Sequence, residues 1–255
     1  MKAKHWGLIV FVLLGIAKLP VEHHTFQRLS AEEVLPPRLE VGVMESLGQM
    51  GLAASLGGLR SMVASGFFLH AASAWDDKDW GAVDNRMGVA TRLDPRYDGY
   101  WDNAGSFMAY DAASYSREQP SFYTRQLYGH YVKRGIEILE QGLSFLPRSY
   151  RLHQNLGEIL SARPEPPDHK RAGEQFLLAF QNGALPVYER RAAYELTKVP
   201  NDPEAWQQAR SILQKSYANG IKLPGVIANL KALEQKLNVP PAQRIPEPMP
   251  PQFGR

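Results

Sequence analysis

The sequence predicts an all-α protein in which antiparallel helical hairpins stack on one another. From residue 41 onward, apolar residues recur at helical spacing, and the strict alternation typical of strands is absent. Glycines and prolines divide this part of the chain into pieces of roughly 10 to 20 residues, the usual length of a helix. The connections between these pieces are short, which makes neighbouring helices antiparallel.

The first element is an apolar run from Trp6 to Ala17, preceded by Lys2 and Lys4. Its length suits a signal segment, and it approaches a bilayer span of roughly 20 residues only if Lys18 reaches the interface. Positive charge before the run predicts a cytoplasmic N-terminus, with the remainder across the inner membrane in the periplasm. We interpret residues 1–21 as a single-pass membrane anchor or a cleaved signal segment. A buried helix is the alternative. The membrane-facing residues would be Trp6, Leu8, Ile9, Val10, Phe11, Val12, Leu13, Leu14 and Ile16.

A polar linker follows over residues 22–40 and contains two adjacent prolines. Residues 41–238 then form the predicted helical domain. The tail, residues 239–255, has six prolines in 17 residues and is typical of an extended or flexible segment. The expected helices cover residues 41–56, 58–76, 79–93, 98–115, 121–146, 149–161, 168–182, 187–198, 202–218 and 225–237.

One motif recurs within the helical domain. Pro95 is followed six residues later by Trp101, and then by Asn103 and Gly105. Pro147 is followed at the same spacing by His153, Asn155 and Gly157. The two copies lie 52 residues apart, and four matching positions at one spacing predict an internal repeat.

These residues resemble the tetratricopeptide repeat. Trp101-x2-Ala104-Gly105 and Leu156-Gly157-x2-Leu160 match the first helix of that pattern, and Ala172-x3-Phe176-x2-Ala179 matches the second. The resemblance covers about residues 64–220 and implies a short α-solenoid. In it, small residues such as Ala71, Gly105 and Gly157 would lie where helices cross, and large ones such as Phe67, Trp101, Leu160 and Phe176 would fill the seams between units. The middle unit is 52 residues long where the family has about 34, so an irregular helical bundle remains the alternative.

The resemblance also implies a binding surface. In this family, the first helix of each unit lines a concave face that holds an extended peptide or a partner protein. An Asn before the Leu-Gly pair contacts the ligand, which points here to Asn103 and Asn155, although each could instead satisfy a helix carbonyl. The expected partner-binding residues are Phe68, Trp75, Asp102, Asn103, Ser106, Tyr110, Gln154, Asn155 and Glu158.

Composition and charge narrow the function. The chain of 255 residues has no cysteine, which excludes disulfides, iron–sulfur clusters and thiol catalysis. Its net charge of +3 is too small for a dedicated nucleic-acid binder. The charge is uneven, however: residues 76–118 carry five basic and nine acidic side chains, a net charge of −4. This acidic block indicates either contact with a charge-complementary partner or ordinary variation of a solvated surface.

The sequence carries none of the common hydrolase, metalloprotease, P-loop or dinucleotide-binding motifs. We therefore predict a non-catalytic, membrane-anchored adaptor that needs no cofactor and no metal and binds protein partners in a bacterial envelope assembly. One alternative is an envelope enzyme or carbohydrate-binding protein that uses the aromatic residues of 97–131 with Asp98, Asp102 and Asp111. Another is a constitutive subunit of a larger membrane complex.

Overall fold

The computed structural model describes residues 59–119 and 123–246, and within them the secondary structure is helical without strands. The all-α prediction is therefore confirmed for this part of the chain. The predicted membrane segment, the linker and the helix expected over 41–56 lie outside the described residues, as does the end of the tail. Among the helices that are described, none is both long and apolar enough to cross a membrane.

Each helix expected between residues 58 and 237 is present, with its ends within about three residues of the prediction. One predicted helix, 98–115, is an arm of three consecutive pieces that contains a π-helix, η1, and continues to Glu118. The elements are α3 (Arg60–Asp76), α4 (Trp80–Leu93), α5 (Asp98–Ser106), η1 (Phe107–Ala112), α6 (Ala113–Glu118), α7 (Thr124–Phe145), α8 (Tyr150–Ala162), α9 (His169–Gln181), α10 (Val187–Lys198), α11 (Pro203–Ala218), α12 (Pro224–Lys236) and the 3-10 turn η2 (Pro241–Gln243).

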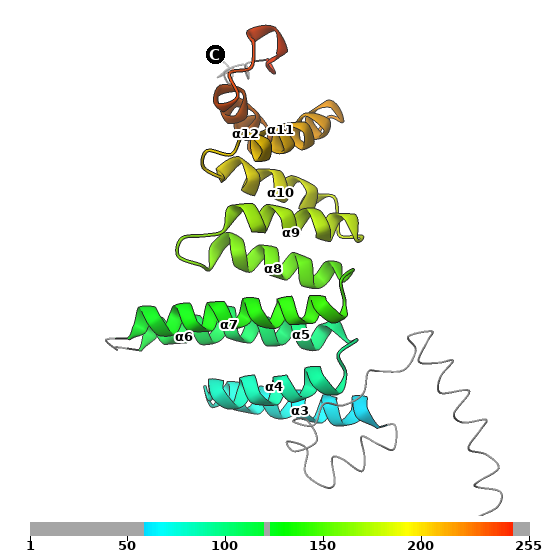
Figure 1. Cartoon of the computed structure of the whole chain (residues 1–255), viewed down its shortest axis with the longest axis vertical. Coiled ribbons are helices and arrows are strands. Elements are labelled where there is room, and N and C mark those ends of the chain that lie inside the picture. Colours follow the sequence, from blue (N-terminus) through cyan, green and yellow to red (C-terminus); the bar gives the residue numbers. More distant parts are fainter. Residues whose placement is uncertain (1–58, 120–122, 247–255) are drawn as a thin grey trace, which may run out of the picture.

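The helices lie across the long axis of an elongated molecule and follow one another in chain order (Figure 1). Helix α3 packs on α4, the α5–η1–α6 arm packs on α7, and α8 packs on α9. Most contacts between elements therefore join neighbours in the chain, and α5 also contacts α8. Helix α7 lies in front of the α5–η1–α6 arm in Figure 1. We call the two faces of the stack the α5 side and the α7 side. Helix α8 is the next helix after α7 along the long axis.

Glycines allow the closest helix crossings. A Cβ atom added to Gly105 on α5 would lie 2.6 Å from Cγ of Leu139 on α7. One added to Gly157 on α8 would lie 2.7 Å from the Phe176 ring on α9. These distances are too short for real side chains, so the glycines are required for the observed packing. The prediction that small residues occupy these two crossings is confirmed.

The recurring proline and aromatic residue form a joint between consecutive helices. Trp101 donates its indole N–H to the carbonyl of Pro95 at 2.9 Å. Nε2 of His153 lies 3.0 Å from the carbonyl oxygen of Pro147, which can only accept, so this ring nitrogen carries the proton. Trp206 repeats the arrangement with the carbonyl of Val199 at 2.8 Å. A spacing of six or seven residues therefore allows a ring N–H to donate to a carbonyl in the turn that precedes its helix.

Candidate partner-binding face

A hollow of about 420 Å³ opens on the α5 side of the stack, between the α5–η1 arm and α8. It brings together six of the nine residues predicted for the partner-binding surface. The hollow is lined by Asp102, Ser106, Tyr110, Tyr150, Arg151, Gln154, Asn155 and Glu158.

Helical spacing explains this convergence. Asp102 and Ser106 are four residues apart on α5, and Asn155 follows Arg151 by four residues on α8, so each set shares one helix face. Tyr110 lies within η1, where the wider turn changes the register of the face. A π-turn inside an α-helix is rare and is frequent at functional sites.

Arg163, at the end of α8, holds the π-turn in place. Its guanidinium donates to the backbone carbonyls of Ala109 at 2.9 Å and Tyr110 at 3.0 Å, and to the hydroxyl of Ser114 at 2.8 Å. It also lies over the ring of Tyr110, 4.8 Å from the centroid. The position of Tyr110 in the hollow therefore depends on a residue that no local pattern connects to it.

Asn155 joins the two walls of the hollow. Its amide nitrogen lies 2.7 Å from Oδ1 of Asp102, 3.2 Å from the Asp102 carbonyl and 2.9 Å from the hydroxyl of Ser106. The two Asp102 atoms are acceptors, so this amide orientation is fixed by its partners. Asn155 is only 9% exposed. It thus shapes the hollow through contacts within the chain.

Not every charged side chain in and around the hollow has an ion-pair partner among the described residues. Glu158 accepts from Arg191 of α10 at 2.6 Å, and Arg151 lies 3.6 Å from Asp98. Asp102 forms no ion pair with any described residue, and burial raises its pKa above the usual range of a carboxyl. Burial and the charge of Glu158 also raise the pKa of Tyr110 to about 12, so its hydroxyl stays protonated near neutral pH.

The remaining predicted residues lie elsewhere. Asn103 and Phe68 line a second hollow of about 380 Å³ with Ser65, Asp94, Tyr97 and Tyr100, toward α3. Trp75 lies farther along α3 and donates its indole N–H to Asp111 at 3.0 Å. The structure thus places Asn103 and Asn155 in two neighbouring hollows, one on each side of α5.

The aromatic cluster of 97–131 does not converge on one site. Asp102 and Tyr110 line the hollow, whereas Trp101 is 2% exposed, stacks on Phe145 and donates its N–H to Pro95. The carbohydrate-binding alternative thus loses its central aromatic residue.

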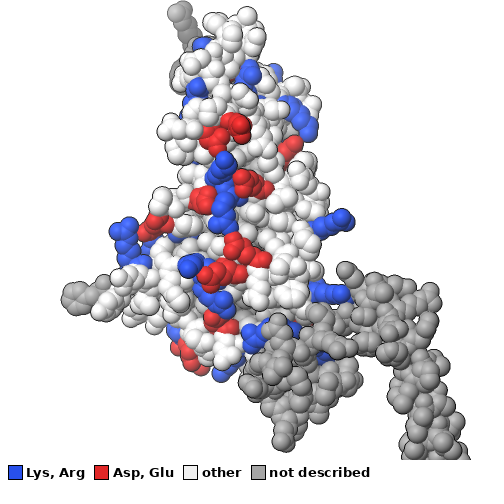
Figure 2. All heavy atoms as spheres, in the orientation of Figure 1, with Lys and Arg blue, Asp and Glu red and all other residues white. Residues whose placement is uncertain are grey.

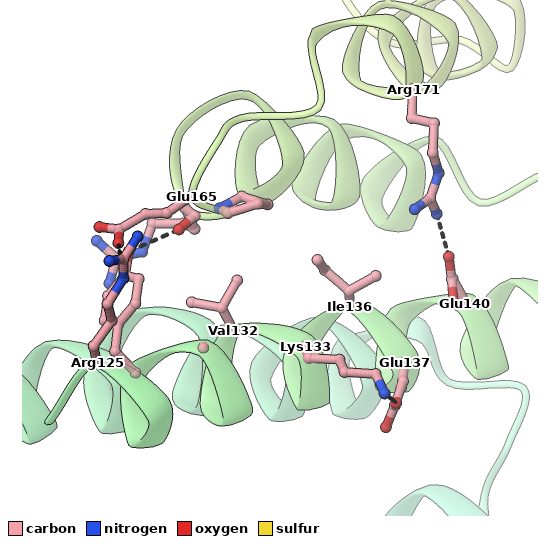
Figure 3. Close-up of a pocket in the computed structure, with 12 residues that line it drawn as sticks. Arg125, Val132, Lys133, Ile136, Glu137, Glu140, Glu165 and Arg171 are labelled. Atoms are coloured by element: carbon pink, nitrogen blue, oxygen red, sulfur yellow. Dashed lines mark hydrogen bonds and ion pairs between the residues drawn. The ribbon is translucent and has the colours of Figure 1, made fainter. Parts of the chain in front are cut away.

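A third groove, which sequence reasoning missed, lies on the α7 side, where α7 meets the α8–α9 connection (Figure 3). Its volume is about 450 Å³, and Tyr128, Val132 and Ile136 contribute its apolar lining. Charged side chains surround these residues but pair with one another, as in Lys133–Glu137, Arg125–Glu165 and Arg171–Glu140. The last two of these pairs join α7 to residues after α8, so no local motif reveals the groove.

Paired charges are general on that side of the molecule. Figure 2 shows acidic and basic side chains alternating in a band along the long axis. Arg134 of α7 pairs with Asp84 of α4 at 2.9 Å, and Lys170 of α9 pairs with Asp202, the N-cap of α11, at 2.8 Å. This side presents neutralised charge, in contrast to the unpaired Asp102 on the α5 side.

The described residues contain no group of three or more His, Cys, Asp or Glu side chains placed to hold a metal ion. Comparison of the chain with protein-family models, curated proteins and solved structures finds no match. Proposals about its function therefore rest on its residues and their geometry.

Proposed function

We propose that this protein is a non-catalytic adaptor of the tetratricopeptide-repeat type whose α5–α8 hollow binds a segment of a protein partner. The observation that supports this most is the convergence of Asp102, Ser106 and Tyr110 with Gln154, Asn155 and Glu158 in one hollow. The repeat pattern assigns both α5 and α8 as first helices, which line the binding face of such repeats.

The shape of the α5 side supports an extended segment as the ligand. Two hollows adjoin across α5, and α3, α5 and α8 contribute their walls in turn. Their polar lining offers both donors and acceptors, among them the Gln154 amide and the Ser106 hydroxyl, which suit a peptide backbone. Aromatic side chains flank these groups and supply the contact area on which peptide recognition depends.

We place this adaptor on the extracytoplasmic side of a bacterial inner membrane. Support comes from the apolar run after Lys2 and Lys4, which has the charge order of a segment with a cytoplasmic N-terminus. Membrane fractions washed with alkaline carbonate test this placement. The full chain should stay in the pellet, and a chain without residues 1–21 should leave it. Release of the full chain by carbonate would contradict a retained anchor.

Site-specific photocrosslinking in cells tests the binding face. A photoreactive residue in place of Gln154, in the hollow, should give a discrete adduct with one partner protein. The matched control carries the same residue in place of Lys133 on α7, whose side chain is 80% exposed. Substitution Tyr110→Ala should remove the Gln154 adduct. Equal adducts from both positions, or none from Gln154, would contradict the proposal.

A further inference from the structure

We propose that the α5–α8 hollow selects a partner segment with an arginine or lysine side chain, which pairs with the carboxylate of Asp102. This inference rests on the proposed function and specifies the chemistry of the partner. It goes beyond a repeat-type binding face because it follows from the charges of this particular hollow.

The charged side chains that the structure describes in and beside the hollow leave one carboxylate without an ion pair. Asp98, Asp102 and Glu158 are in or beside the hollow, while Arg151 and Arg191 are the cations paired with Asp98 and Glu158. The charged residues that line the hollow itself are Asp102, Glu158 and Arg151, with a net charge of −1. Arg163, a third cation beside Tyr110, donates to the carbonyls of Ala109 and Tyr110 and to Ser114, so Asp102 is the acid of this group without an ion pair to any described residue. The same helix belongs to the block of residues 76–118 that carries a net charge of −4.

The environment of the Asp102 carboxylate favours a cationic partner. Oδ1 accepts from Asn155 at 2.7 Å, which fixes the carboxylate plane, and no described residue donates to Oδ2. The side chain is partly buried, and an ionised carboxyl in such a place is costly until a cation or donor pairs with it. A guanidinium or ammonium group from a partner supplies both the charge and the donors.

The aromatic lining of the hollow also suits a cationic side chain. Tyr150, which is 45% exposed, presents its aromatic ring in the same hollow as Asp102, beside Tyr110, whose ring is already in contact with the Arg163 guanidinium. Aromatic faces attract cations, and a cationic side chain also lays its apolar stem against such rings. An acidic or phosphorylated segment fits poorly, because it would meet unpaired negative charge.

The α7-side groove provides an internal contrast. It is similar in volume, but Figure 3 shows the charges around it engaged with one another, with Arg171 directed to Glu140 and Lys133 to Glu137. A cationic ligand there would have to displace an existing pair. The preference for a basic segment therefore belongs to the α5 side.

The experiment is a selection of random dodecapeptides, displayed on phage between flexible linkers so that no terminal amine is near the variable residues. The full chain in detergent is the target. Selected peptides should be enriched in Arg or Lys at one position. Their affinity should fall at least tenfold with Asp102→Asn and change less than twofold with Glu137→Gln, which removes the same charge from the α7 side. Circular dichroism confirms that both variants fold.

The outcomes separate the two proposals. Peptides that require Tyr110 but show no Arg or Lys preference, or that bind equally to Asp102→Asn, would overturn the basic-segment inference and leave the adaptor function intact. Absence of any peptide that requires Tyr110 would count against the adaptor function itself, and the inference would fall with it. If Glu137→Gln also abolishes the enrichment in Arg or Lys, the selection reflects a general charge effect. That result would likewise overturn the inference.

Discussion

The backbone of Gly105 on α5 lies directly against Gly135 on α7. A Cβ atom added to Gly135 would lie 2.6 Å from the carbonyl oxygen of Gly105 and 2.6 Å from Cβ of Ala109. Since one of these neighbours is backbone, it cannot move aside as a flexible side chain does. This contact sets the separation of the two helices and thereby the position of the α5 wall of the hollow.

Substitution Gly135→Ala should therefore destabilise the protein by about 1–3 kcal/mol, the usual cost of overpacking. Gly129→Ala is the matched control in the same helix, because no atom lies within 4 Å of its added Cβ. There, the better helix propensity of alanine should stabilise the protein by up to about 1 kcal/mol. Urea denaturation followed by circular dichroism measures both. Equal effects at the two positions would mean that the crossing is looser than described.

Substitution Arg163→Ala should remove the hydrogen bonds that hold η1 and cost about 1.5–3 kcal/mol, as expected for bonds from a charged donor. Arg148→Ala is the control for loss of a positive charge at an exposed site, and it should change stability by less than about 0.5 kcal/mol. Both free energies come from urea denaturation. A neutral Arg163→Ala would show that the π-turn holds without its partner.

Substitution Trp101→Phe keeps an aromatic ring in the seam but removes the N–H that Pro95 accepts. We expect a loss of about 1–3 kcal/mol, because a buried carbonyl is left without its donor. Trp206→Phe should cost less, since Trp206 is only partly buried and water can replace the lost donor. Thermal unfolding of the two variants tests this order. A larger loss for Trp206→Phe would contradict the role of burial.

Substitution Asp102→Asn should raise stability near neutral pH. Burial raises the pKa of Asp102, with Asp98, Arg151 and Glu158 as its charged neighbours, so its ionisation costs folding free energy. Wild-type stability should thus fall as the pH rises through the raised pKa. The variant avoids that loss, and its amide oxygen still accepts from Asn155. In urea denaturation at several pH values, the variant and wild type should differ little in acid, separate as the pH rises to the raised pKa, and keep a constant difference above it.

Asp202→Asn provides a comparison of opposite sign. The pKa of Asp202 is lowered, first by its hydrogen bond with Lys170 and then by the backbone N–H of Ala205. Its ionisation therefore favours the folded state, and wild-type stability from this group is lost as the pH falls through the lowered pKa. Asp202→Asn should destabilise near neutral pH. Matching signs for Asp102→Asn and Asp202→Asn would contradict the assigned environments. Asp102→Asn should therefore stabilise the fold and at the same time lose peptide binding. This combination is expected of a residue kept for binding.

Much of the helical order could be predicted from the sequence because its signals are local. Prolines and glycines mark the helix ends, and Asp79 illustrates the mechanism: its carboxylate accepts from the N–H of Ala82 and caps α4. Helical spacing was also sufficient to group Asp102 with Ser106, and Gln154 with Glu158. The membrane segment, the partner-binding role and the repeat assignment stay predictions.

The parts that sequence reasoning missed depend on contacts between distant residues. The π-turn leaves no trace in apolar periodicity, and its partner Arg163 lies 53 residues beyond Tyr110. Arg191, which pairs with Glu158 from α10, lies 33 residues beyond it in the chain. The unpaired state of Asp102 therefore appears only when all surrounding charges are placed. Asn103 on α5 and Asn155 on α8 occupy equivalent positions of the recurring motif, yet only Asn155 lies between α5 and α8, whereas Asn103 lies in the hollow toward α3.

The joints formed by Trp101, His153 and Trp206 have a consequence for how this chain could change in evolution. Each joint is confined to one turn and the start of the next helix, so it sets the direction in which the following helix leaves. The far ends of the hairpins take no part in it. Helical arms can therefore lengthen or shorten without redirecting the stack, which is how the long α5–η1–α6 and α7 arms stand beside the shorter α8 and α9 (Figure 1).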